Sequence, residues 1–356
     1  MAESVDAADS KSAGGNIVGV RFPLSAPKHL KKPGRCKALD CITHITPPSE
    51  APLRVPSQAA LERPSCLRAG WLAIRPKTLT VSLVPVLVGS AAAWSQTQAF
   101  HWVPALIALL AAMLIQIGTK LHNDVSDFER GADTAARLGP PRATAMGWLP
   151  AGAVRRSAWV AFGLAFNLGV YLAWHGGWPI VAIGLSSLVA GWAYTGGARP
   201  IAYTPFGEFF VWLFFGMVAV SGSYYLQTRS VSAPALLAGC MIGLLAAGVI
   251  TVNNYRDLES DALAGKRTLA VLLGRRATQW VYSAEMLLPF ALLPVLAVLA
   301  GRRAWLALPL LVLPAVLVQI GRFRREAPGP AFNGLLARSA GLQLIFGVLL
   351  AIALIA

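Results

Sequence analysis

The stretch TLTVSLVPVLVGSAAAWSQTQAFHWVPALIALLAAMLIQIGT, residues 78–119, contains no aspartate, glutamate, lysine or arginine. A helix of about 20 apolar residues crosses a bilayer, so this stretch is long enough for two crossings. The polar residues at 96–98 divide it into halves, which predicts a helical hairpin that turns there. Residues 157–198 are equally free of charge and carry a polar, glycine-rich break at 175–177, which predicts a second hairpin.

The rest of the chain divides into further apolar runs in the same way. They lie near residues 207–226, 234–252, 278–299, 304–320 and 339–355. Together with the two hairpins they predict nine transmembrane helices. The runs are continuous rather than alternating between polar and apolar residues, and this excludes a membrane β-barrel. The predicted fold class is therefore an all-α, multi-pass membrane protein.

The amount and placement of charge support a membrane protein. Only 13% of the 356 residues are charged, about half the roughly 25% of a soluble domain. If the N-terminus is cytoplasmic, all 31 lysines and arginines except Arg229, Arg302 and Arg303 fall on the cytoplasmic side. The net charge of +15 then follows the positive-inside rule and needs no nucleic-acid partner. We predict an inner (cytoplasmic) membrane location, with the C-terminus outside.

The N-terminal segment differs from the remainder of the chain. Residues 1–68 are polar, contain several prolines and lack the apolar core of a signal peptide. We predict that they form a flexible cytoplasmic tail, and that residues 69–356 form the transmembrane domain. The four cysteines show no CxxC spacing, which indicates neither a zinc site nor a disulfide scaffold.

Most acidic residues of the transmembrane domain gather in two clusters. Both clusters follow the cytoplasmic end of an even-numbered span, the second and the sixth, so both face the same side. In the second cluster Asn253, Asp257 and Asp261 are spaced four apart and therefore share one helix face. The acids of the two clusters are Asp124, Asp127, Glu129 and Asp133, and Asp257, Glu259 and Asp261.

This pattern predicts a site for Mg²⁺ and a pyrophosphate. Crowded carboxylates repel one another unless a cation lies between them, and Mg²⁺ takes oxygen ligands that it shares with substrate phosphates. Basic residues that could hold phosphate surround both clusters. A solvated loop with exposed salt bridges is the alternative for one cluster, but two clusters on one face disfavour it. These basic residues are Lys120, Arg130, Arg137, Arg142, Arg256, Lys266 and Arg267.

Several strings resemble the UbiA superfamily of intramembrane prenyltransferases, from about Arg75 to the C-terminus. Within it they are most similar to the branch that prenylates 1,4-dihydroxy-2-naphthoate in the menaquinone pathway. Val125 and Ser126 depart from the aromatic residues usual in the first motif, and Lys120 and His122 precede it where neutral residues are more usual. The strings are RPKTL at 75–79, NDVSDFERGAD at 123–133, LGPPRA at 138–143, YTGGARPIAY at 194–203 and NNYRDLESDALAGKRTLAVLLG at 253–274.

The resemblance implies nine helices around a central cavity that is capped by the loops after the second and sixth helices. It also implies transfer of a polyprenyl chain from an allylic pyrophosphate to 1,4-dihydroxy-2-naphthoate, with decarboxylation to demethylmenaquinol. Two Mg²⁺ ions would assist, and no obligate protein partner is indicated. The metal ligands, direct or through water, would be Asn123, Asp124, Asp127, Asn254, Asp257 and Asp261, with Asp133 as a further candidate from the first cluster.

The remaining roles divide between the two substrates. Asp127, Asp257, Lys266 and Arg267 are the predicted catalytic residues, and the last two would hold pyrophosphate. Lys120, Arg130, Arg142 and Arg256 are further candidates for binding pyrophosphate. In the loop after the fourth helix, Tyr194, Arg199 and Tyr203 match a stretch that the family uses beside its substrates. An interfacial aromatic belt is the alternative role for the two tyrosines, and a topology anchor is the alternative for Arg199.

Other functions stay open at this point. A sister prenyltransferase could use 4-hydroxybenzoate, homogentisate, haem or a phytyl donor, and the metal motifs do not separate these substrates. A secondary transporter is a second alternative, but transporter sites lie near the bilayer midplane, whereas these acids lie at span ends. A non-catalytic scaffold would leave the paired clusters unexplained.

Overall fold

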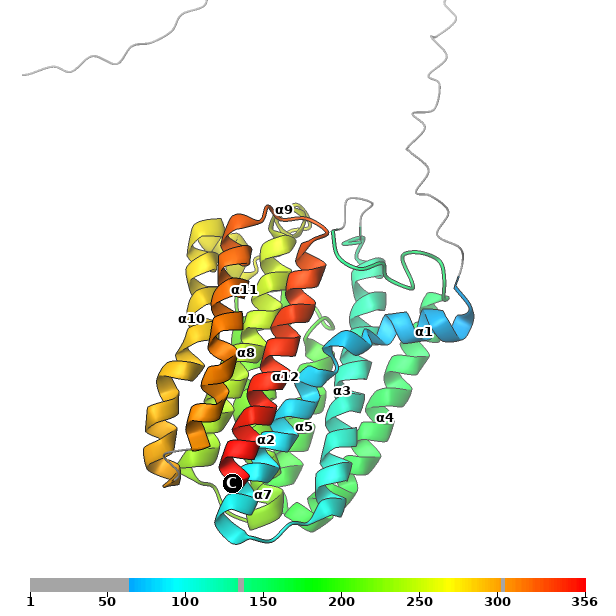
Figure 1. The fold of residues 1–356 in the computed structure, drawn as a ribbon. Coiled ribbons are helices and arrows are strands. Elements are labelled where there is room, and N and C mark those ends of the chain that lie inside the picture. The colour runs from blue at the N-terminus through cyan, green and yellow to red at the C-terminus, as the bar shows by residue number, and fades with distance from the viewer. Residues whose placement is uncertain (1–63, 134–137, 302–304) are drawn as a thin grey trace, which may run out of the picture. The chain divides into compact units, whose positions relative to one another are not determined.

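The structure, a computed structural model, describes residues 64–133, 138–301 and 305–356, and every regular element within these ranges is helical (Figure 1). The predicted all-α fold is confirmed for this part of the chain. Most of the predicted tail, together with Arg302 and Arg303, lies outside the described residues. Helix α1 (Cys66–Ile74) begins within the last residues of that predicted tail.

Both hairpins turn where the sequence predicts. In the first, the short 3₁₀ turn η1 leads into α2, and Gln98 ends α2 in the left-handed conformation at φ 53°. In the second, Gly177 at φ 71° separates the two helices, a conformation that glycine adopts without steric cost. The elements of the hairpins are η1 (Pro76–Thr78), α2 (Thr80–Thr97), α3 (Trp102–Glu129), α4 (Ala151–Gly176) and α5 (Trp178–Ala193).

The C-terminal half contains long helices that are interrupted at several points. A π-helical turn, η3, joins α6 to α7, and Gly274 at φ 72° kinks the start of α10. The hydroxyl of Thr268 accepts a hydrogen bond from the Val271 amide and caps α10. The elements are η2 (Ile201–Tyr203), α6 (Gly207–Trp212), η3 (Leu213–Val218), α7 (Ala219–Thr228), α8 (Ala233–Arg256), α9 (Leu258–Leu263), α10 (Leu269–Ala300), η4 (Trp305–Val312), α11 (Leu313–Arg325) and α12 (Phe332–Ile355).

Fewer helices than the predicted nine are long and apolar enough to be recognised as membrane spans. Seven helices of the described part are long and apolar enough, and an eighth span results if α1–η1 and α2, which bend by 47°, count as one. Helix α5 is apolar but has only 16 residues, which is shorter than the roughly 20 that a crossing needs. By length and composition, therefore, the predicted nine is not reached.

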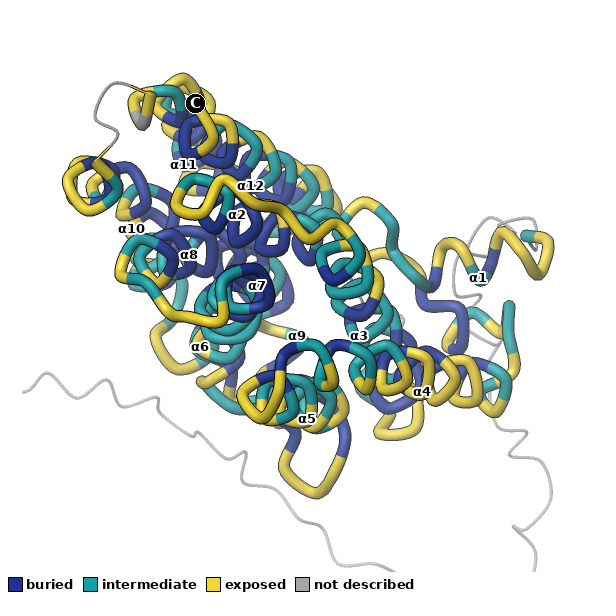
Figure 2. Tube along the Cα trace, turned by 90° about the horizontal axis from the view of Figure 1, so that it is seen from below, coloured by how far each residue is buried: buried dark blue, intermediate teal, exposed yellow. Residues whose placement is uncertain are grey.

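Helix α8 lies at the centre of the main core, where it packs against α10 and α12. Buried positions are concentrated on α8, α2 and α12, whereas α4 and α5 are largely exposed (Figure 2). Close approach is possible because α8 and η3 meet through glycines: a Cβ on Gly216 would lie 2.4 Å from the Cα of Gly243. Large apolar side chains such as Trp159 and Trp174 face outward, as in proteins surrounded by lipid.

Candidate active site

The two acidic clusters, more than a hundred positions apart in the sequence, meet around one ammonium group. Asp127 comes from the C-terminal turn of α3, and Asp261 from α9, the short helix that follows α8. The Nζ of Lys266 lies 3.1 Å from Asp261 Oδ1 and 3.9 Å from Asp127 Oδ2. Because the acids of separate motifs share a cation, the fold brings the predicted site together.

Asp127 is the most heavily contacted of these carboxylates. Its Oδ2 accepts a hydrogen bond from the Arg142 guanidinium at 2.6 Å, and its Oδ1 accepts one from the Tyr203 hydroxyl at 3.0 Å. Asp127 and Arg142 are both buried, which strengthens their ion pair relative to one in water. The side chain is thus fixed by contacts from the loop before α4 and from the turn η2.

Asp257 is held in a different way, by its sequence neighbour. Arg256 is fully buried and donates to both oxygens of Asp257, at 2.7 and 2.5 Å. The same guanidinium donates to Asn253 Oδ1 at 2.9 Å and to Asn333 Oδ1 at 2.6 Å. The Asn333 amide in turn donates to the backbone oxygen of Leu138 at 3.1 Å. Arg256 therefore joins α8 to α12 and to the loop after α3.

The two neighbouring asparagines of the second motif have different surroundings. Asn253 lines a large cavity inside the helix bundle, whereas Asn254 donates to Glu208 Oε1 on α6 at 2.8 Å. Successive residues of an α-helix differ in direction by about 100°, so only one of the pair faces the cavity. The structure therefore places Asn253, rather than the predicted ligand Asn254, at the cavity.

Asp124 and Asp133 contact the loop that carries Arg142. Both oxygens of Asp124 accept backbone amide hydrogens, from Ala143 at 3.0 Å and from Thr144 at 3.1 Å. Asp133 Oδ1 lies 3.2 Å from Nε of Arg142. The first cluster thus holds residues 142–144, before α4, in place, and Arg142 reaches Asp127 from there.

The loop between α5 and α6 is held by Arg130, which donates to the carbonyls of Thr195 at 2.5 Å and Gly197 at 2.8 Å. A Cβ on Gly196 would lie 2.7 Å from a backbone oxygen, so this position requires glycine. Arg199 is exposed on the same loop and does not line the cavity.

Tyr203 lies between Arg130 and Lys266, whose charged groups are 5.6 and 4.9 Å from its ring centre. The neighbouring Arg267 is exposed, and its backbone amide donates to the Tyr203 carbonyl at 3.0 Å. The structure therefore brings Tyr203 and Lys266 to the site, while the side chain of Arg267 faces outward.

Burial and neighbouring carboxylates raise the pKa of three groups at this end of the bundle. Burial raises the pKa of Asp261, and the negative charges of Asp257 and Asp127 raise it further, against the opposing effect of Lys266. Burial also raises the pKa of Tyr194 and of Tyr203, with an added effect of nearby carboxylates. Both phenols therefore keep their protons at neutral pH.

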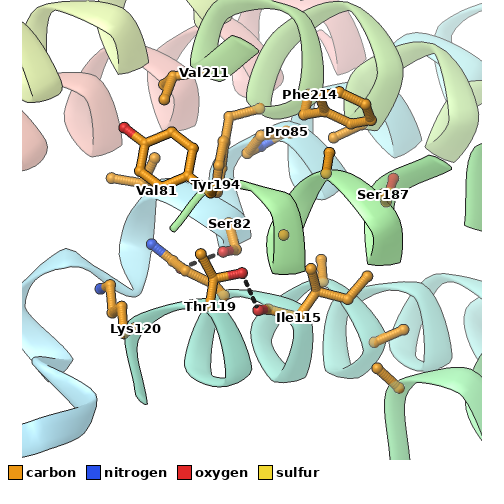
Figure 3. A pocket seen from close by; sticks show the side chains of 18 of the residues that line it. Val81, Ser82, Pro85, Ile115, Thr119, Lys120, Ser187, Tyr194, Val211 and Phe214 are labelled. Carbon is orange, nitrogen blue, oxygen red and sulfur yellow. Dashed lines mark hydrogen bonds between the residues drawn. The ribbon is translucent and has the colours of Figure 1, made fainter. Parts of the chain in front are cut away.

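An apolar cavity of about 1010 Å³ lies beside these residues, between α2, α3, α5, η3 and α8. Asn123, Asn253, Arg142 and Tyr194 line it next to the acidic cluster. Lys120, Ser82 and Tyr194 also line it (Figure 3). A long apolar chain with a charged head group matches this combination of apolar walls and a polar end.

The donor set suits Mg²⁺ when a phosphate group supplies further ligands. Within the described ranges, no three carboxylate, histidine or cysteine side chains form a metal-binding group by themselves. However, Asp127 and Asp261 already bracket the Lys266 ammonium, which shows that the two motifs can share a cation. Oxygen ligands completed by substrate phosphates are the usual arrangement for Mg²⁺.

Sequence reasoning missed several polar residues that the structure brings to the site. Asn333 on α12 and Glu208 on α6 belong to no motif, and each contacts a second-motif residue across the bundle. Thr78, Ser82 and Gln116 lie inside apolar runs and line the cavity. A polar residue within an apolar run is the signal that could have identified Glu208, Ser82 and Gln116. Asn333 lies between two predicted runs and gives no such signal.

Comparisons with known proteins agree with this architecture. The profile of the UbiA prenyltransferase family matches residues 82–354. A 1,4-dihydroxy-2-naphthoate octaprenyltransferase of Bacillus subtilis (strain 168) is 33% identical over 306 residues, covering 84% of this chain and 96% of that protein. A protein of the same name from Mycobacterium tuberculosis (strain ATCC 25618 / H37Rv) is 34% identical over 279 residues, covering 78% of this chain and 93% of that protein. The structure of a UbiA homologue from Archaeoglobus fulgidus bound to GPP and Mg²⁺ shares this fold, with a TM-score of 0.61 at 17% identity over 81% of this chain and 99% of that one.

Proposed function

The chain belongs to the UbiA prenyltransferase family, and from this premise we propose that it transfers a polyprenyl chain from an allylic pyrophosphate to 1,4-dihydroxy-2-naphthoate. Decarboxylation then gives demethylmenaquinol. The observation that carries the proposal is the meeting of Asp127 and Asp261 around Lys266 beside an apolar cavity. The naphthoate acceptor is supported by the names of relatives that share a third of their residues with this chain.

In this proposal the basic residues of the site bind the pyrophosphate. Lys266 and Arg142 both lie against Asp127, so a pyrophosphate bound beside Asp127 is within reach of both cations. Two Mg²⁺ ions, held by Asn123, Asp127, Asn253, Asp257 and Asp261, would supply Lewis-acid stabilisation of the charge on the departing pyrophosphate. Fixed cations add to that stabilisation because the site is shielded from bulk water.

The cavity provides the second half of the chemistry. When the carbon–oxygen bond of the allylic pyrophosphate breaks, the pyrophosphate keeps the electron pair. Apolar walls then protect the allylic cation from water. A ring carbon of the naphthoate forms the new carbon–carbon bond, and the carboxyl group is lost as CO₂. Tyr194, which lines the cavity and keeps its phenolic proton, is the residue we place beside the acceptor.

We further propose that the chain crosses the inner membrane nine times, with the N-terminus and the active site on the cytoplasmic side. The distribution of lysine and arginine supports this orientation, and α5 would cross as a short helix. In a variant whose four cysteines are replaced by serine, a membrane-impermeant thiol reagent added to intact cells should label Arg229→Cys. It should leave Arg199→Cys unlabelled, and the reverse result would overturn the orientation.

The reaction itself is tested with protein purified in detergent. Farnesyl or geranylgeranyl pyrophosphate and Mg²⁺ are supplied with 1,4-dihydroxy-2-naphthoate, 4-hydroxybenzoate or homogentisate, and mass spectrometry identifies the product. We expect prenylated, decarboxylated naphthoquinol, which should disappear with a chelator or in the Asp127→Ala variant. Product formed from one of the other acceptors instead would show that this acceptor, and not the naphthoate, is the substrate. No transfer to any acceptor by folded protein would overturn the enzymatic proposal.

A further inference from the structure

A row of hydrogen-bonded polar side chains runs along one wall of the cavity. Lys120 Nζ donates to Thr78 Oγ1 and lies 3.5 Å from the backbone oxygen of Arg75. Gln116 donates to the backbone oxygen of Thr78 at 2.9 Å, and Ser82 donates to the Gln116 side chain. We refer to Thr78, Ser82, Gln116 and Lys120 as the polar strip. It connects α3 to η1 and to the start of α2.

The walls around the polar strip are largely apolar. Val81 and Pro85 of α2 and Phe214 of η3 line the same space, and Figure 3 shows them with Lys120, Ser82 and Tyr194. A prenyl chain needs no polar partner, so the polar strip has no function toward that part of the donor. It indicates a second ligand that carries polar groups.

No carboxylate of the described ranges pairs with the amino group of Lys120, and the positive charge of Arg75 lies nearby. The carboxylates of the site pair with Arg142, Arg256 and Lys266, and the contacts of Lys120 are an uncharged hydroxyl and a backbone carbonyl. A cation inside a membrane-embedded cavity is costly without a counter-ion. Lys120 is therefore suited to bind an anionic group of a ligand.

The position of Lys120 determines which anion it can bind. Lys120 precedes Asp127 by seven residues on α3, which is two turns or about 10 Å along the helix axis. Its ammonium is hydrogen-bonded toward η1, whereas Arg142 and Lys266 lie against Asp127. The pyrophosphate of the donor belongs with those two residues, so the anion at Lys120 comes from the other substrate.

We propose that Lys120 binds the carboxylate of the aromatic acceptor, with the rest of the polar strip holding Lys120 in place. This inference rests on the proposed function and deepens it, because it assigns the acceptor site to the wall formed by α3 and η1. It also replaces the sequence-based prediction that Lys120 binds pyrophosphate. The site would select an aromatic acid over the same ring without a carboxylate.

A comparison of two acceptors in the Lys120→Met variant tests the assignment. The wild type and the variant are assayed with 1,4-dihydroxy-2-naphthoate and with 1,4-naphthalenediol, which lacks the carboxylate, at varied farnesyl pyrophosphate. We expect the KM for the naphthoate to rise at least tenfold, while the KM for farnesyl pyrophosphate and turnover of the diol stay within twofold of the wild type. The Lys120→Arg variant, which keeps the charge, should recover most of the naphthoate affinity.

Arg156→Met is the matched control, since Arg156 is exposed on α4 and its loss removes one positive charge away from the cavity. It should leave all three kinetic constants unchanged. A rise in the KM for farnesyl pyrophosphate in Lys120→Met would assign Lys120 to the donor and overturn the proposal. An equal loss of activity toward both acceptors would show a structural role and would also overturn it.

A binding experiment without turnover separates this inference from the proposed reaction. The fluorescence of 1-hydroxy-2-naphthoate reports its binding, and 1-naphthol serves as the carboxylate-free probe. We expect the Kd of the naphthoate to rise at least tenfold in Lys120→Met and the Kd of 1-naphthol to stay the same. Unchanged naphthoate binding overturns the inference, whether or not the protein turns over the naphthoate acceptor.

Discussion

The hydroxyl of Tyr203 donates a 3.0 Å hydrogen bond to Oδ1 of Asp127, and this bond joins the loop after α5 to the first acidic motif. Arg142 contacts the other oxygen of the same carboxylate. Lys266 lies over the Tyr203 ring at 4.9 Å, so the tyrosine also contacts the second motif's cation. Tyr203 is thus the point at which three separate segments of the chain fix the orientation of one carboxylate.

Replacing Tyr203 by phenylalanine should weaken donor binding without unfolding the site. The ring and its contact with Lys266 remain, and only the hydrogen bond to Asp127 is lost. A hydrogen bond to a charged group contributes about 1.5 kcal/mol or more, so we expect kcat/KM for the allylic pyrophosphate to fall about tenfold. Steady-state kinetics at saturating Mg²⁺ measures this. Activity equal to the wild type would show that the hydroxyl does not orient Asp127.

Replacing Lys266 by methionine should separate metal binding from turnover. Lys266 lies between Asp127 and Asp261, and its loss leaves two carboxylates near each other without a cation. We expect turnover to fall by about a hundredfold or more, because a fixed positive charge near the leaving group is lost.

Mg²⁺ should raise the unfolding temperature of Lys266→Met more than that of the wild type, because no ammonium group then competes with Mg²⁺ for the carboxylates. Thermal unfolding in detergent with and without Mg²⁺ tests this second part. Lys266→Arg is the control that keeps the charge and should respond as the wild type does. An equal response of the methionine variant and the wild type would count against a cation site shared by the two motifs.

The meeting of the two acidic clusters is the part of the site that the sequence could predict. Both clusters follow even-numbered spans, so alternation of the crossings places them on one side. Asp257 and Asp261 are spaced by one helical turn. The structure then shows Asp261 and Asp127 on a common cation. Periodicity and charge are properties of the local sequence. They suffice to predict on which side of the membrane and on which face of a helix a residue lies.

The orientation of individual side chains depends on tertiary packing and could not be predicted in the same way. Whether Asn253 or Asn254 faces the cavity depends on the rotation of α8, which its packing against α10 and α12 fixes. The surroundings of Lys120 depend on η1, which begins after Arg75 takes up a left-handed conformation at φ 55°. No local pattern encodes that turn, because residues other than glycine rarely adopt a positive φ.

The raised pKa of Asp261 predicts a specific dependence of stability on pH when no metal is present. Its folded-state pKa lies above the value of an unfolded chain, so protonation of Asp261 favours the folded state. Its stabilising contribution is therefore present at acid pH and decreases as the pH rises through the folded-state pKa. Relative to Asp261→Asn, the wild type should lose stability over this interval and regain it with Mg²⁺. Thermal unfolding of both proteins between about pH 4 and pH 7 measures the difference. A constant difference across this range would contradict the prediction.

Asp124 either anchors the loop that carries Arg142 or binds the metal, and one substitution distinguishes these two roles. In the structure both of its oxygens accept backbone amides of Ala143 and Thr144, which adjoin Arg142. If Asp124 anchors this loop, Asp124→Ala leaves two buried donors unpaired, which costs about 2 kcal/mol or more. The unfolding temperature should then fall by about 5 °C.

The matched control for Asp124→Ala is Glu129→Ala in the same cluster. Among the residues that the structure describes, Glu129 pairs only with Arg155, in an exposed ion pair, so its loss should change stability by less than about 1 kcal/mol. Asp124→Asn, which keeps one acceptor oxygen, should give an intermediate loss of stability. Turnover should fall in step with stability across these variants, because the loop that positions Arg142 against Asp127 loosens. If instead Asp124→Ala unfolds at the wild-type temperature but needs far more Mg²⁺ for half-maximal activity, the carboxylate is a metal ligand and its contacts with the loop rearrange when the metal binds.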